Sequence, residues 1–89
     1  MRLADVAEEL GRHDEALAAC ERGLQHADGP ILRNGLQMIR AGALLAKGQR
    51  GPAREALAEA EKAANAIGNE RVRRNKLGRV SKLRAQTGP

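Results

Sequence analysis

Residues 41–60, AGALLAKGQRGPAREALAEA, decide how this chain folds. The centre of the stretch, residues 48–52, contains two glycines and a proline, which interrupt regular structure more strongly than other residues. Pro52 can open a new helix, because its fixed φ suits the first turn and its missing N–H is not needed there. The stretch therefore predicts two helices joined by a turn too short for a crossover, so the helices must pack as antiparallel neighbours.

The same signals place three further helices. The sequence DGP at residues 28–30 repeats the glycine–proline pattern, and Gly68 followed by Asn69 is typical of one helix ending and the next being capped. Near the N-terminus an apolar stripe ends at Leu10, and Gly11 follows where a helix would stop. We therefore expect an all-α fold of five helices, over about 3–10, 14–27, 30–47, 52–67 and 70–86.

Composition sets the size and kind of core. The chain has 89 residues, of which 42% are hydrophobic, and it contains no Phe, Tyr or Trp. This length predicts one domain, and its core must be built from Ala, Leu, Ile, Val and Met. A single cysteine excludes an internal disulfide. Neither a signal peptide nor a spanning helix is recognisable, so we expect a reducing, cytoplasmic setting.

The sequence shows no group of residues typical of a catalytic, metal or cofactor site. His13 and Cys20 share a helix but lie two turns apart, about 10.5 Å along its axis, which is too far for a nucleophile and its base. Serine and threonine occur once each, and no glycine-rich phosphate loop is present. We therefore expect no enzyme activity, no metal and no cofactor.

Charge is distributed unevenly along the chain. Residues 1–28 contain seven acidic and three basic side chains, a net charge of −4, whereas residues 69–89 contain seven basic and one acidic, a net charge of +6. The C-terminal cations surround their helix and have no aromatic neighbour to stack on bases. This arrangement favours cations that face solvent or contact an acidic protein surface. Binding of these cations to nucleic acid stays the alternative. Opposite charges at the two ends also predict self-association.

Small residues followed seven positions later by glycine recur along the chain. The pairs begin at Ala4, Ala41 and Ser81, which are 37 and 40 residues apart, and a further alanine follows each of the first two glycines by five positions. A small residue lets two helices approach, and glycine permits the turn between them. The positions that define this pattern are Ala4, Gly11, Ala16 and Cys20, and then Ala41, Gly48, Ala53, Leu57 and Ala60.

On these residues the chain resembles the tetratricopeptide repeat family, in the longer form seen in bacterial transcriptional activators and nucleotide-signalling regulators. It departs from the family pattern where Ala7, Cys20, Leu44 and Leu57 stand at aromatic positions. The resemblance implies a short solenoid of stacked antiparallel hairpins within a single domain, 1–89. It comprises a truncated repeat (1–28), a full repeat (30–68) and the first helix of a third (69–88), and belongs to a longer array or is completed by a partner or a second copy.

The resemblance also implies a concave groove, because the first helix of each repeat lines that side in the family. The groove would bind a peptide or helix of another protein, an acidic one included. The chaperone-binding clamp of asparagine and lysine is not visible. An alternative reading is that Met38 and Leu45 simply pack against a neighbouring helix. The groove residues would be Asp5, Glu8 and Glu9 at one end, Gly35, Met38, Gly42 and Leu45 in the middle, and Arg79 and Lys82 at the other.

Overall fold

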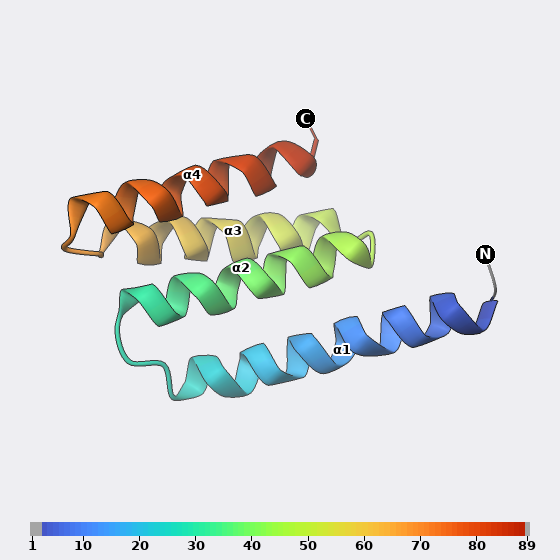
Figure 1. Cartoon of the computed structure of the whole chain (residues 1–89). Helices are drawn as coiled ribbons and strands as arrows, with labels where there is room; N and C mark the ends of the chain where they lie inside the picture. Colours follow the sequence, from blue (N-terminus) through green and yellow to red (C-terminus); the bar gives the residue numbers. More distant parts are fainter. Residues whose placement is uncertain (1–2, 89) are drawn as a thin grey trace.

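A computed structural model describes residues 3–88, with side chains from residue 11 onward, and its regular elements are all helices. They are α1 (Leu3–Gln25), α2 (Pro30–Ala46), α3 (Arg50–Asn65) and α4 (Glu70–Gln86). Figure 1 shows each helix running antiparallel to the one before it. The all-α prediction is confirmed, and the last three helices begin and end close to where the turn signals placed them.

The expected count of five helices is wrong, because α1 runs without interruption through Gly11. One glycine inside a helix costs only about 1 kcal/mol relative to alanine, and the next proline is Pro30. The apolar stripe also continues past the glycine through Leu17, Cys20 and Leu24, so packing against α2 can stabilise a single long helix. No turn divides residues 3–25, and the hairpin expected there is absent.

A glycine cap ends α2 and begins the turn into α3. Gly48 has φ 77°, a left-handed conformation that favours glycine. Its N–H donates to the carbonyl oxygen of Leu45 at 2.9 Å, and the N–H of Gln49 donates to that of Leu44 at 2.9 Å. These two hydrogen bonds form a Schellman motif, which satisfies carbonyls left free at a helix end. The turn quoted at the outset is therefore held by backbone hydrogen bonds.

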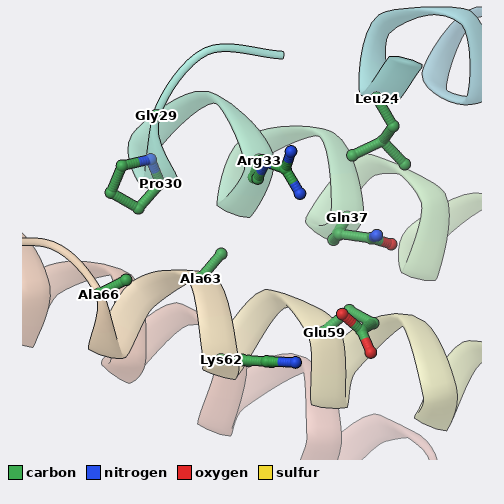
Figure 2. Close-up of a pocket in the computed structure, with 9 residues that line it drawn as sticks. All are labelled: Leu24, Gly29, Pro30, Arg33, Gln37, Glu59, Lys62, Ala63 and Ala66. Atoms are coloured by element: carbon green, nitrogen blue, oxygen red, sulfur yellow. The ribbon is translucent and has the colours of Figure 1, made fainter. Parts of the chain in front are cut away.

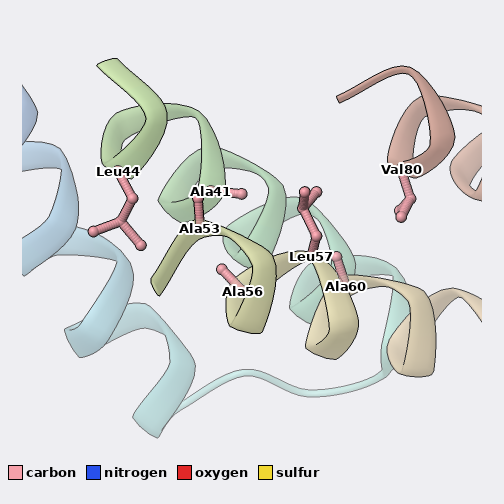
Figure 3. Close-up of a cluster of buried hydrophobic side chains, with 7 residues drawn as sticks. All are labelled: Ala41, Leu44, Ala53, Ala56, Leu57, Ala60 and Val80. Carbon is pink, nitrogen blue, oxygen red and sulfur yellow. The ribbon is translucent and has the colours of Figure 1, made fainter. Parts of the chain in front are cut away.

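The core lies where α2 and α3 meet and where α4 covers α3. Its centre is made largely of alanine, which allows close helix packing without large side chains. Leu57 is the largest fully buried side chain and is completely inaccessible to solvent. The cluster contains Ala41 and Leu44 from α2, Ala53, Ala56, Leu57 and Ala60 from α3, and Val80 from α4 (Figure 3).

The helices form a staggered arrangement. Among the described helices α1 packs on α2 alone, whereas α4 packs on α3 and also meets α2. Gly23 brings α1 close to α2, because a Cβ at this position would lie 3.1 Å from a methyl group of Leu36. Lys47, beyond the end of α2, forms an ion pair with Asp14 of α1. α2 and α4 meet and run in the same direction (Figure 1). A hollow lies between α2 and α3, with Leu24 of α1 at its edge (Figure 2).

Candidate interaction surface

One arc of α2 faces solvent although all of its side chains are apolar. Three of its members are large and about half exposed, at 52% for Ile31, 51% for Leu32 and 54% for Ile39. Its residues recur every three or four positions, so they share one face of the helix. The charged residues of α2 lie elsewhere on its circumference. We call this surface the apolar strip, and it consists of Ile31, Leu32, Gly35, Ile39, Gly42 and Ala46.

Two glycines of the apolar strip border open space. A Cβ built on Gly35 or on Gly42 would meet no atom within 4 Å, in contrast to Gly23, where Leu36 lies 3.1 Å away. Glycine in the middle of a helix costs roughly 0.5–1 kcal/mol relative to alanine. At Gly23 the close approach of α1 to α2 explains the residue. At the two strip positions no packing among the described residues does so.

A hollow of about 430 Å³ lies beside the C-terminal end of the strip, between α2 and α4. Gln86 is on its rim, and Lys82 and Arg79 lie one and two turns earlier on the same face of α4. These two cations therefore lie along the same side of the molecule as the strip. The hollow is lined by Gly42, Leu45, Ala46, Gly48, Arg50, Leu83 and Gln86.

Three exposed cations of α4 are arranged beside the strip. Arg71, Arg79 and Lys82, which we call the basic row, form no hydrogen bond or ion pair with any residue that the structure describes. Other cations of α4 are paired, since Arg74 contacts Glu70 at 2.8 Å and Arg84 contacts Glu61 at 2.6 Å. The basic row thus comprises the exposed cations of α4 that have no described partner, whereas Lys76, also without one, is partly buried.

The structure divides the groove residues expected from the sequence into two groups. Gly35 and Gly42 belong to the apolar strip, and Arg79 and Lys82 belong to the basic row. Met38 and Leu45 are only partly exposed and pack against the buried core cluster. For these two side chains the structure matches the alternative of packing against a neighbouring helix. The expected acidic end, Asp5, Glu8 and Glu9, lies outside the described side chains.

Sequence reasoning missed the most exposed apolar residues of the surface, Ile31, Leu32 and Ile39. The signal was present, because steps of three and four residues from Leu32 pass through both glycines to Ala46. The expected trough was instead drawn through Met38 and Leu45. That line lies on the side of α2 that packs against the core cluster, and it is therefore partly covered.

The residues that define the repeat pattern lie in different environments. Gly48 occupies the α2–α3 turn, Gly11 is exposed in the middle of α1, and Ala16 is partly buried. Cys20 is 2% exposed, and burial raises the pKa of its thiol, with the guanidinium of Arg40 opposing this effect only in part. Ala4 lies outside the described side chains. The fully buried members are Ala41, Ala53, Leu57 and Ala60.

A second hollow, of about 360 Å³, lies between the ends of α1, α2 and α3 (Figure 2). Leu24, Pro30 and Ala66 line it, together with the charged residues Arg33 and Lys62. The Oε1 atom of Gln37 is buried nearby and accepts no hydrogen bond from the described residues. Because this oxygen has almost no accessible surface, a molecule in the hollow cannot reach it, and it does not mark a ligand site.

Among residues 11–88, whose side chains the structure describes, no three His, Cys, Asp or Glu side chains come together as metal ligands would. None of the described helices combines the length and the apolar character needed to cross a membrane. Comparisons with protein-family models, with curated proteins and with solved structures found no match to this chain.

Proposed function

We propose that the chain is a non-catalytic protein–protein interaction module, built as a short tetratricopeptide-like stack of helical hairpins. In this proposal a helix or peptide of another protein binds over α2 beside α4. The observation that carries it is the apolar strip, on which Ile31, Leu32 and Ile39 are each about half exposed. Contiguous exposed apolar surface on a helix is typical of protein interaction sites.

The arrangement of the helices supports the repeat reading. Residues 30–68 form one antiparallel hairpin, and α4 packs on this hairpin so that it lies beside α2. In tetratricopeptide arrays the first helices of adjacent repeats line one surface, and α2 and α4 would correspond to these helices. The continuous α1 departs from this scheme, because it replaces a hairpin by one helix.

A photoreactive amino acid in place of Ile39 tests this function directly. After illumination in lysate, we expect this variant to form discrete crosslinks with another protein, since Ile39 is 54% exposed on the proposed surface. The same photoreactive residue at Ala58, exposed on α3, is the matched control and should give no such product. Equal crosslinking from both positions, or from neither, would remove the support for a binding surface on α2.

Nucleic-acid binding is the second candidate, and the basic row favours it. Arg71, Arg79 and Lys82 are exposed without partners among the described residues, and such cations can neutralise phosphates. A salt titration separates the two functions. Contacts to several phosphates give an affinity for DNA or RNA that falls steeply with salt, whereas a protein segment held mainly by apolar contacts on the strip should keep most of its affinity.

A further inference from the structure

We infer that the occupant of the apolar strip is an α-helix with one apolar edge and one acidic edge, supplied by another protein. Its apolar edge lies on α2 and its acidic edge faces the basic row of α4. This inference rests on the interaction function proposed above and names the class of partner for the same surface. Three features carry it: the chemistry of the strip, its two open glycines, and the unpaired cations alongside.

The chemistry of the strip selects a helix over an extended peptide. Its side chains are those of Ile, Leu and Ala, which neither donate nor accept hydrogen bonds. The backbone groups in the middle of α2 are already bonded within the helix. An extended segment pressed against this surface would bury peptide N–H and C=O groups without partners, which is unfavourable. A helix satisfies its own backbone and can present side chains alone.

The open glycines allow that helix to approach closely. Gly35 and Gly42 are two turns apart on one face, and neither has an atom within 4 Å of its Cβ position. Helices pack at distances set by the side chains at their contact, so glycine gives the smallest separation. Ile39 lies between the two glycines on the same face and would extend along the partner helix.

The basic row indicates which charge the partner carries and where its charged edge lies. α4 carries seven cations against Glu70 alone, and Arg79 and Lys82 have no described partner. They lie on the face of α4 that borders the hollow beside Gly42. Complementary charge at the edge of an interface mainly steers association and fixes orientation. Acidic residues along one edge of the partner would therefore set how it lies across α2.

A designed peptide tests this inference. The probe is an 18-residue helix of Leu, Ala and Glu, with its apolar residues at steps of three and four, glutamates along one edge and one tryptophan. Because the chain contains no Trp, Tyr or Phe, tryptophan emission reports on the peptide alone. Two matched peptides replace every Glu by Lys, or keep the acidic composition and add two central prolines. We expect the acidic helix to bind at least about tenfold more tightly than either, which corresponds to about 1.4 kcal/mol.

Variants of the chain locate the peptide. Ile39→Glu should weaken binding of the acidic helix at least about tenfold, whereas Ala58→Glu on α3 should leave it unchanged. Arg79→Glu and Lys82→Glu, made singly, should each weaken binding of the acidic peptide and improve binding of the lysine peptide, with Lys62→Glu on α3 as the control for the same change of charge. Gly42→Ala adds one methyl group to the strip and no charge. Peptide binding to this variant still tests the strip if Ile39→Glu fails to fold.

The outcomes separate this inference from the function on which it rests. If the proline peptide binds as tightly as the helix and Ile39→Glu abolishes both, the interaction function stands and the helical partner is wrong. Equal binding of the lysine peptide would overturn the acidic edge. A dimer of the chain that Ile39→Glu dissociates would assign the strip to a second copy and overturn an outside partner. If no peptide responds to Ile39→Glu, or if only DNA or RNA binds, both proposals fail.

Discussion

The side-chain amide of Asn34 in α2 donates a hydrogen bond of 2.8 Å to the backbone carbonyl oxygen of Ala60 in α3. Asn34 is 1% exposed, and the surrounding interface is made of alanine and leucine. Alanine packing alone fixes helix register weakly, because small side chains offer few distinct ways to interlock. A single buried polar bond, which is lost if the helices slide, therefore holds α2 against α3 in one register.

Replacing Asn34 by Asp keeps the shape of the side chain and removes the donor. At pH 7 the ionised carboxylate would face the Ala60 carbonyl oxygen without water, so we expect a loss of roughly 3 kcal/mol or more in unfolding free energy. Burial raises the pKa of such a carboxyl above its value in the unfolded chain. The loss should therefore shrink as the pH falls from this raised pKa toward about 4, the ordinary pKa of Asp, because the buried acid is then protonated and donates again.

Urea denaturation at pH 3.5 and at pH 7 measures this difference relative to the parent chain. Asn75→Asp is the control, because Asn75 is exposed on α4. An equal loss for Asn34→Asp at both pH values would mean that its side chain does not face the carbonyl oxygen.

A graded series tests which apolar residues stabilise the fold. Leu57→Ala should cost about 2–5 kcal/mol, because Leu57 is fully buried in the core. Met38→Ala should cost less, about 1–2 kcal/mol, because Met38 packs on the core from a partly exposed position. Ile39→Ala should change stability by about 0.5 kcal/mol or less. Chemical denaturation gives all three values. A larger loss of stability at Ile39 than at Met38 would mean that Ile39, and not Met38, faces the core.

The sequence predicted α2, α3 and α4 because each boundary carries strong local chemistry. The α2–α3 turn contains Gly48, whose positive φ the structure shows, and α4 begins at Asn69, whose side chain accepts a hydrogen bond from the N–H of Val72 at 3.0 Å. Gly11 was misread as a helix end. A lone glycine permits a turn without imposing one, and whether α1 continues depends on its packing against α2.

Only part of the surface could be predicted. Gly35 and Gly42 stood out because glycine in the middle of a helix is unfavourable without a close neighbour. Met38 and Ile39 are adjacent in sequence and about 100° apart around the helix, and both are apolar, so periodicity alone does not decide which of the two is buried. Which of them is covered is decided by how α3 and α4 pack against α2, and that packing depends on contacts distant in sequence.

The thiol of Cys20 reports on how firmly α1 packs. It is 2% exposed, and burial raises its pKa, so little reactive thiolate is present in the folded chain. We expect labelling by a disulfide reagent at pH 8 to be at least about a hundredfold slower than in denaturant, since reaction requires local opening. Ser81→Cys on exposed α4, in a Cys20→Ala background, is the control. Similar labelling rates at both positions would show that α1 is not packed on α2.

Three glycine-to-alanine substitutions should separate open helix surface from close helix contact. Gly35→Ala and Gly42→Ala should each raise the unfolding free energy by about 0.5–1 kcal/mol, because alanine favours the helix and the new methyl group meets nothing within 4 Å. Gly23→Ala brings the same helical preference, but its methyl group would lie 3.1 Å from Leu36. The side chain of Leu36 must shift, so the gain should be smaller or negative.

Urea unfolding of the three variants measures the differences. Equal stabilisation at all three positions would mean that α1 does not approach α2 at Gly23, and a loss at Gly42 would mean that the space beside the apolar strip is already filled.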